Sequence, residues 1–529
     1  MKPTADSLPD HRWWIPSTTT LLAAAIGLTF ILRMKFWGQP FEMDEGAHAY
    51  MGWGILQGLV PYKEMYNGKP PGIFLIHSLL FLVVEPTALN IKIFATIYTL
   101  GTLVAVFLVT KELADKRAGL LAALLFGIFS TGPNIQGGGV NSEVFMLLPY
   151  TLATYSLLKA VKTGSRKSYL FFGLWTGLAC SFKQVAGVNV FWFGGYVLLQ
   201  MWRARDWSTI AHSFKNGLWV VAGMLISWLP FFFYFLLSGA LRDFYFWQTT
   251  ASFRYIVEGH RGMSNFTIFW RQMKIVLSEN GLLWLTAIVG IVWAWKHYLK
   301  PEAKDSEIKE WSWQQTAWVL MATWPLFSFL GVAVGGRFFA HYFIQIIPSL
   351  AILGGVGLAK IIDELRARRM GYFRRPEGFL IAVALLLFIR TDAPYYLTYN
   401  GIQISLKQYE TPLFSVTRSI GKHLCERTEP DDFIYVWAVN PEINFYALRK
   451  TPSPYLMHVS LDKLPWDAYE EIMQSLHRAS PKYIVEMQGT SGFPALQEYI
   501  RENYTPETDP DLDRLKQLVP FQIFRRKDT

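Results

Sequence analysis

Two acidic residues and a lysine stand out in a polar segment, residues 37–89, that follows the first strongly apolar stretch of the chain. Asp44 and Glu45 are adjacent, and Lys69 stands before two prolines. A lysine beside carboxylates at a membrane surface is a natural phosphate ligand. Each residue type also has an ordinary explanation, because an Asp often caps a helix and an interfacial lysine can extend toward lipid headgroups. The residues after the acidic pair, "GAHAYMGWGILQG", predict a short amphipathic helix lying on the membrane.

A further carboxylate, Glu143, ends a Gly-rich turn at 132–142 and begins an apolar stretch. An unpaired carboxylate at the edge of a membrane is costly, which makes Glu143 a second candidate for contact with a substrate. The alternative is that it simply interacts with the positive end of its own helix. The sequence favours neither explanation, and Asn141 is its neighbour in both.

The composition indicates a membrane protein. Of 529 residues, 52% are hydrophobic and 17% are charged, whereas a soluble protein usually has about a quarter charged residues. The net charge of +10 is better explained by basic cytoplasmic loops than by nucleic-acid binding. Cys180 and Cys425 give no disulfide framework and no metal-ligand spacing.

Eleven apolar stretches are long enough, or nearly so, to cross a bilayer as helices. The first resembles a signal-peptide core at residues 21–32, but no small-residue cleavage pattern follows, so we expect a retained anchor. The predicted spans are 15–36, 90–110, 117–133, 143–161, 168–181, 187–203, 216–237, 276–296, 315–334, 341–360 and 377–391.

The basic residues predict the orientation of these spans. Five loops rich in Lys and Arg belong in the cytoplasm by the positive-inside rule, which puts the N-terminus inside and the C-terminus outside. The apolar residues 72–84 then begin and end on the outer side, so we expect them to lie along the interface. Arg33 and Lys35, on the outer side, count against this orientation.

The tail, residues 392–529, has more charge and no long apolar run. Residues 431–439 and 481–487 read as buried strands, and the residues before the second strand, from Trp466 to Ser480, read as a helix. We therefore expect a C-terminal α/β domain outside the membrane, acting as a lid or in acceptor recognition, after a transmembrane domain at 1–391.

The segment "DEGAHAYMGWGILQGLVPYKEMYNGKPPG" resembles the first extracytoplasmic loop of the GT-C glycosyltransferases. The resemblance is to the subgroup of protein O-mannosyltransferase-like enzymes and bacterial aminoarabinose transferases of lipid A, which use polyprenyl-phosphate sugars. In that family an Asp-Glu pair, a G-x-x-P-Y stretch and a Lys-Pro-Pro follow one another. Here these motifs are Asp44-Glu45, Gly58–Tyr62 and Lys69-Pro70-Pro71, and further similarity occurs at 141–158, 177–184 and 337–353.

The resemblance implies a GT-C fold and sugar transfer on the outer face of a bacterial inner membrane. Asp44 would be the base that takes the proton of an acceptor hydroxyl, with Glu45 as its catalytic neighbour, and inversion would follow from a single displacement. Lys69 would hold the leaving lipid phosphate. Glu143, with Asn141, would help to bind the sugar or the acceptor. The further residues implied to bind the donor phosphate or the substrate are Lys183, Arg254, His260, Arg261, Arg337, His341 and Tyr342.

Two departures from the family pattern bear on the chemistry. Aminoarabinose transferases have a Glu before the loop lysine that can help to bind a metal, whereas this chain has Asn67-Gly68. The His-Pro-Pro form of eukaryotic protein mannosyltransferases is also absent. We therefore predict no metal ligand and name no cofactor, while the need for a divalent metal stays open.

The expected partners are a polyprenyl-phosphate sugar donor, an acceptor lipid, glycan or protein, and the membrane. The alternatives are an aminoarabinose-type transferase acting on lipid A, a transporter or flippase for a lipid-linked sugar, and a non-catalytic scaffold. Internal repeats and polar mid-membrane helices would favour a transporter, and the sequence shows neither.

Overall fold

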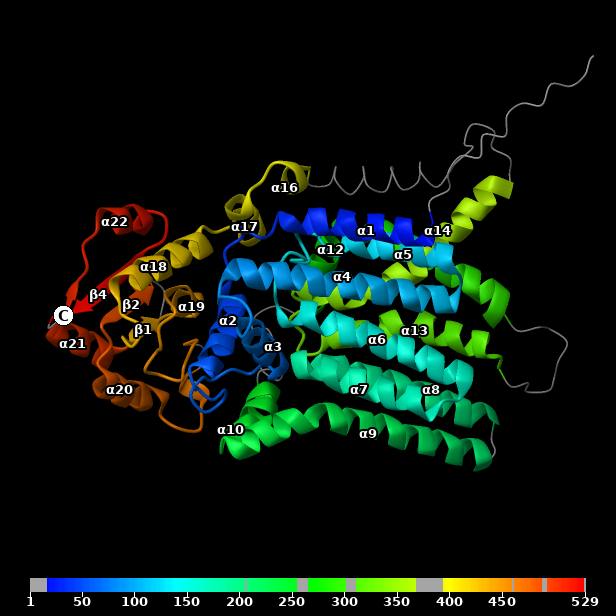
Figure 1. The fold of residues 1–529 in the computed structure, drawn as a ribbon, viewed down its shortest axis with the longest axis horizontal. Coiled ribbons are helices and arrows are strands. Elements are labelled where there is room, and N and C mark those ends of the chain that lie inside the picture. The colour runs from blue at the N-terminus through cyan, green and yellow to red at the C-terminus, as the bar shows by residue number, and fades with distance from the viewer. Residues whose placement is uncertain are drawn as a thin grey trace, which may run out of the picture.

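The structure is a computed structural model that describes residues 17–204, 207–254, 265–300, 311–367, 393–458, 461–487 and 492–527. Two kinds of architecture follow each other along the chain: long helices side by side, and then a small sheet with helices around it (Figure 1).

The long helices run side by side, as expected for apolar segments that bury their backbone polar groups by forming helices (Figure 1). Ten of the eleven predicted spans coincide with a helix, and the eleventh, 377–391, lies outside the described residues. The helices are α1 (Thr18–Met34), α4 (Ala88–Leu113), α5 (Lys116–Phe129), α6 (Ser142–Thr163), α7 (Arg166–Phe182), α8 (Val188–Ala204), α9 (Trp207–Leu237), α12 (Asn265–Ala294), α13 (Trp313–Ala333) and α14 (Ile347–Ala367).

Among the described residues, seven of the helical segments are long and apolar enough to cross a membrane. α1, α5 and α7 are shorter, with 17, 14 and 17 residues. In the most apolar 18-residue stretch of Ala340–Ala367, which contains α14, 94% of the residues are buried, whereas the share is 22% in the corresponding stretch of Ile210–Leu237 in α9. α14 therefore lies in the centre of the bundle and α9 lies at its surface.

Two short helices lie at one end of this bundle, between it and the sheet (Figure 1). α3 (Gly72–Phe81) has 10 residues, which is too few to cross a bilayer. This agrees with the prediction that 72–84 does not span the membrane, and its position along the interface stays a prediction. α2 (Met43–Leu56) is the helix predicted after the acidic pair. The expectation that it lies on the membrane is wrong, because its residues from Glu45 to Gly54 are all buried inside the protein.

The tail forms a four-stranded sheet in the order β1-β2-β4-β3. β1 (Ile434–Trp437) and β2 (Tyr483–Met487) are parallel, and β4 (Phe521–Arg526) pairs antiparallel with β2 and with β3 (Tyr504–Pro506). Alternate residues of β1 enter different cores, Ile434 and Val436 on one face, and Tyr435 and Trp437 on the other, as the period of two in a strand requires.

The strands predicted at 431–439 and 481–487 are therefore confirmed, and β3 and β4 were not foreseen. The helices of the tail are α16 (Ala393–Leu397), α17 (Gly401–Tyr409), α18 (Leu413–Arg427), α19 (Glu442–Ala447), α20 (Ala468–Ala479), α21 (Pro494–Asn503) and α22 (Pro510–Lys516). Shorter pieces occur at α10 (Leu241–Tyr245), η1 (Gln184–Gly187), η2 (Phe246–Ala251), η3 (Trp295–Leu299), η4 (Ala340–Ile346) and η5 (Leu461–Lys463).

Candidate functional site

Asp44 lies in the first turn of α2 but does not cap it. The cap is Glu42, whose carboxylate accepts from the Glu45 amide at 3.1 Å, while the Glu45 carboxylate accepts from the Glu42 amide at 3.1 Å. This capping box satisfies the orphan amides at the helix start. The Asp44 carboxylate is therefore available for another partner, and the capping explanation of this residue does not hold.

That partner is Lys69. The Lys69 Nζ lies 3.2 Å from Asp44 Oδ2, and the two side chains are 24% and 34% exposed. The backbone around the lysine is fixed by three hydrogen bonds. Its carbonyl accepts from the Tyr62 hydroxyl at 2.6 Å and from Gln248 Nε2 at 3.0 Å, and its amide donates to Asn67 Oδ1 at 2.9 Å. The ion pair thus sits on a rigid loop and stays partly open to solvent.

A second cluster forms around Glu143, in the first turn of α6. Its carboxylate forms an ion pair with Lys183, which follows the end of α7, and lies 3.7 Å from His341 Nε2 at the start of the segment before α14. The Lys183 Nζ also lies 3.7 Å from the centre of the Tyr342 ring, a cation–π distance. Three distant stretches of sequence therefore place four predicted residues together.

The pKa of Asp44 reflects both clusters. Partial burial and the negative charge of Glu143 raise this pKa. The positive charge of Lys69 and the electrostatic interaction with His48 lower it, and they outweigh the other two effects, so the pKa lies below its ordinary value. Asp44 is therefore an ionised carboxylate at neutral pH, beside an ammonium group and within electrostatic reach of Glu143.

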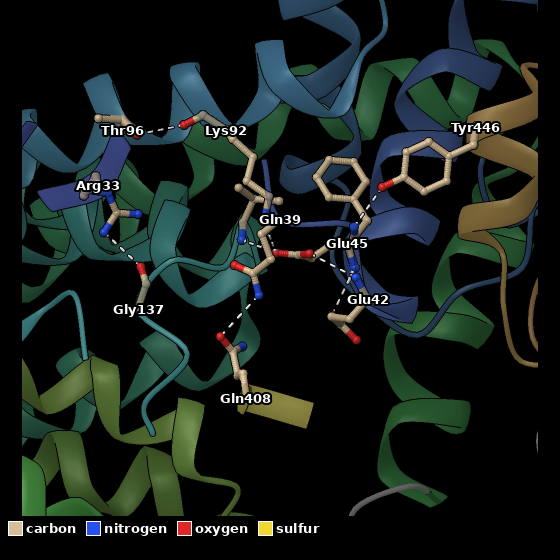
Figure 2. A network of polar contacts seen from close by, with 11 residues as sticks. Arg33, Gln39, Glu42, Glu45, Lys92, Thr96, Gly137, Gln408 and Tyr446 are labelled. Carbon is tan, nitrogen blue, oxygen red and sulfur yellow. Dashed lines mark hydrogen bonds and ion pairs between the residues drawn. The ribbon is translucent and has the colours of Figure 1, made fainter. Parts of the chain in front are cut away.

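Glu45 faces away from this opening. Its side chain is 1% exposed, and its Oε1 lies 3.3 Å from Lys92 Nζ of α4 and accepts from the Val140 amide at 2.6 Å. Figure 2 shows this network, in which Glu45 lies between Lys92 on one side and the capping contact with Glu42 on the other. These contacts fix α2 to the bundle. Because the Glu45 carboxylate is buried and cannot meet a substrate, the structure gives no support to its predicted catalytic role.

Comparison with known proteins identifies the fold. The chain is similar over 96% of its length to the crystal structure of ArnT from Cupriavidus metallidurans bound to undecaprenyl phosphate, with a TM-score of 0.64, 14% identity and 97% of that chain covered. It is also similar to the oligosaccharyltransferase AglB from Archaeoglobus fulgidus in complex with an inhibitory peptide and a dolichol-phosphate (TM-score 0.53, 15% identity, 89% of this chain and 69% of that chain).

The chain has the GT-C fold. Together with the seven apolar helices, this makes it a multi-pass membrane protein. Residues 68–238 also match the family model described as dolichyl-phosphate-mannose-protein mannosyltransferase. That range includes Lys69, Glu143 and Lys183, whereas Asp44 and His341 lie outside it.

Sequence similarity to a curated relative is more limited. The chain is 26% identical over 175 residues to the Stt3 subunit of the dolichyl-diphosphooligosaccharide–protein glycosyltransferase of Schizosaccharomyces pombe. The match covers 31% of this chain and 22% of that subunit. The resemblance to GT-C proteins stated from the sequence is thus confirmed for the fold.

The remaining residues predicted for the site lie outside the two clusters around Asp44 and Glu143. Asn141 is the buried residue that precedes α6, and its side chain makes no capping bond. Arg337 is half-buried in the segment between α13 and η4, and Arg254 is exposed at the end of the described range 207–254. His260 and Arg261 lie outside the described residues. The assignment of these five residues to substrate binding stays a prediction.

Sequence reasoning missed several residues that build the candidate site. Gln248, which lies between the predicted spans 216–237 and 276–296, supports the Lys69 backbone. Lys92 was visible as a charge inside an apolar stretch, a signal for a buried partner. His48 is one helical turn after Asp44, a spacing that places two side chains on one face of a helix. Asn67, noted only as a departure from the family, bonds the Lys69 amide.

Proposed function

We propose that this protein is a glycosyltransferase that moves a sugar from a polyprenyl-phosphate donor to an acceptor hydroxyl, with inversion at the anomeric carbon. The observation that carries this proposal is the partly exposed Asp44–Lys69 ion pair beside the Glu143–Lys183–His341 cluster. It combines one ionised carboxylate with several groups able to hold a phosphate.

In the proposed reaction the acceptor oxygen attacks the anomeric carbon while Asp44 takes its proton. The bond between the anomeric carbon and the phosphate oxygen breaks, and the electron pair leaves with the lipid phosphate. That leaving group needs cations rather than a proton. In the described contacts Lys69 pairs with Asp44 and Lys183 pairs with Glu143, so these two lysines are the cations proposed to hold the phosphate.

Lys69 connects proton removal by Asp44 with stabilisation of the leaving phosphate. In the structure its ammonium group is engaged by Asp44. A bound phosphate would compete for the same ammonium and weaken its hold on the carboxylate. The pKa of Asp44 would then rise toward its ordinary value, which makes it a better base when the donor is present.

The choice of donor is supported by the fold. ArnT was solved with undecaprenyl phosphate and AglB with a dolichol-phosphate, and both share this arrangement of helices. We further propose a bacterial inner membrane as location, a transmembrane catalytic domain at 1–391, and an extracytoplasmic domain at 392–529, with the site on the outer face, as the positive-inside rule predicts.

An aminoarabinose-type transferase acting on lipid A is the second candidate, because the similarity to ArnT covers nearly the whole of both chains. Asn67-Gly68, where a Glu would stand immediately before Lys69, weighs against a metal-assisted version of that reaction. The nature of the sugar separates the two candidates.

The test uses the full chain in lipid nanodiscs with a panel of undecaprenyl-phosphate sugars, including glucose, mannose and aminoarabinose. Sugar release to water and transfer to lipid and protein fractions of bacterial membranes are both measured. The proposal expects one or a few donors to be consumed by the wild-type chain, and the same donors to be consumed about 10²–10⁴-fold more slowly by Asp44→Asn. Equal consumption by both chains would refute Asp44 as the base, and consumption of no donor by the wild-type chain would refute the proposed reaction.

A further inference from the structure

The helix that bears Asp44 is held from a second side by the tail of the chain. Gly46, two residues after Asp44, packs directly on Glu442 at the start of α19. A Cβ added at position 46 would lie 2.7 Å from the Glu442 backbone nitrogen and closer still to its Cα and Cβ. Real side chains do not approach backbone that closely, so only glycine lets α2 and α19 meet here.

Hydrogen bonds on both sides of Gly46 continue this contact. The Tyr446 hydroxyl of α19 accepts from the Phe41 amide at 2.8 Å, just before α2 (Figure 2). The Tyr50 hydroxyl of α2 accepts from the Thr451 amide at 3.0 Å, just after α19. The Glu45–Lys92 pair holds the same turn to the bundle from the opposite side. The first turn of α2 is therefore fixed between the helical bundle and the tail.

Glu442 is an unusual residue to place at such a contact. Its side chain is buried, one oxygen accepts from Asn440 Nδ2 at 2.9 Å, and the other has no hydrogen-bond partner among the described residues. A buried carboxylate with an unsatisfied oxygen is costly when charged.

We propose that Glu442 is a positioning residue: its neutral form lets α19 press on Gly46 and fixes the turn of α2 that carries Asp44. The part of the inference that concerns catalysis rests on the proposed glycosyltransferase function. The part that concerns the contact itself does not, and it gives the tail a role in building the site.

The electrostatics make the contact sensitive to pH. Burial, with a smaller contribution from Glu45 on α2, raises the pKa of Glu442 to about 7, while the hydrogen bond from Asn440 acts against this. Because the pKa of Glu442 is raised above the ordinary 4.5, the stabilisation of the contact between α19 and α2 is complete below pH 4.5. It is lost as the pH rises through about 7. Of the other groups near Glu442, Tyr446 has its pKa raised above 10 by burial, so it does not titrate in this range.

The test is amide hydrogen exchange of the full chain in nanodiscs, followed over residues 43–56 and corrected for the intrinsic effect of pH. In the wild-type chain we expect protection of this segment to fall by about tenfold per pH unit as the pH rises from 4.5 to about 7. Glu442→Gln, which cannot ionise, should keep protection constant. Gly46→Ala should lose protection at every pH, because its methyl group separates the two helices.

Two variants control for general effects. Gly27→Ala adds a methyl group in a helix where nothing lies within 4 Å, and Glu498→Gln removes an exposed carboxylate of the tail. Both should behave as wild type. Unchanged protection in Gly46→Ala, or the same pH dependence in Glu442→Gln as in wild type, would overturn the inference even if no sugar donor were ever found.

If a donor is consumed, a kinetic test of the link to catalysis follows. In the wild-type chain kcat should fall on the alkaline side, and Glu442→Gln should flatten this fall with undecaprenyl phosphate binding unchanged. A fall equal to that of wild type would contradict the link to catalysis.

Discussion

At the scale of single residues, Asp44 and Lys69 have separable roles that a substitution can distinguish. Asp44→Asn keeps the size of the side chain but cannot accept a proton. We expect it to lower sugar transfer by about 10²–10⁴-fold, the usual contribution of a general base. Binding of undecaprenyl phosphate, measured by native mass spectrometry, should be unchanged or tighter, because Lys69 loses its competing carboxylate. Transfer at the wild-type rate would show that another group is the base.

Lys69 is expected to act through its charge. Lys69→Ala should weaken binding of undecaprenyl phosphate by about tenfold or more. Lys69→Arg keeps a positive charge with a different geometry, so it should retain part of the wild-type affinity. The measurement is a titration of each variant in nanodiscs, with Lys63→Ala, an exposed lysine of the same loop, as the control. Equal affinity of the Ala and Arg variants would refute a phosphate ligand at position 69.

At the scale of elements, α2 depends on the buried Glu45–Lys92 pair. Glu45→Gln leaves the Lys92 ammonium buried without a counter-charge, which costs about 3–5 kcal/mol. The double variant Glu45→Gln with Lys92→Met removes both charges and should recover much of this loss. Thermal unfolding of the two variants in the same detergent checks the prediction. A double variant as unstable as the single one would show that the pair itself does not fix the helix.

The elements also show what sequence alone could reveal. Apolar runs predicted the helices of the bundle, since a span is a local property of about 20 residues. The position of α2 was not predictable in this way. Its burial depends on Glu442 and Tyr446, about 400 residues further along the chain, and on Gly46, which has a steric role only once α19 is in place. An amphipathic pattern does not distinguish a membrane surface from a protein surface.

The same reasoning applies to the site. Asp44, Lys69, Glu143, Lys183 and His341 were selected by residue type and by resemblance, and the structure brings them together. Glu45 was selected with them because it is adjacent to Asp44. Adjacent residues on a helix point about 100° apart, so one carboxylate of the pair faces solvent while the other reaches Lys92. Motif membership alone did not separate these two directions.

At the scale of the whole molecule, orientation in the membrane is the prediction on which the location of the site depends. The tail should lie outside the cytoplasm. A C-terminal alkaline-phosphatase fusion, which is active only outside, should therefore be active in bacteria, and a matching fusion of a fluorescent protein that matures only inside should be dark. Fusions at Thr163, at the end of α6, should give the reverse pattern, because Lys159, Lys162, Arg166 and Lys167 belong to a cytoplasmic loop. The opposite result at either point would place the Asp44 site on the wrong side for an extracytoplasmic acceptor.

The most direct test of the whole account is an experimental density map of the full chain in nanodiscs with undecaprenyl phosphate. We predict that the phosphate lies within about 3 Å of the Lys69 Nζ, that Lys183 is close to it, and that the Asp44 carboxylate is released toward the open side of the site. A phosphate bound elsewhere, with the Asp44–Lys69 pair intact, would contradict the account.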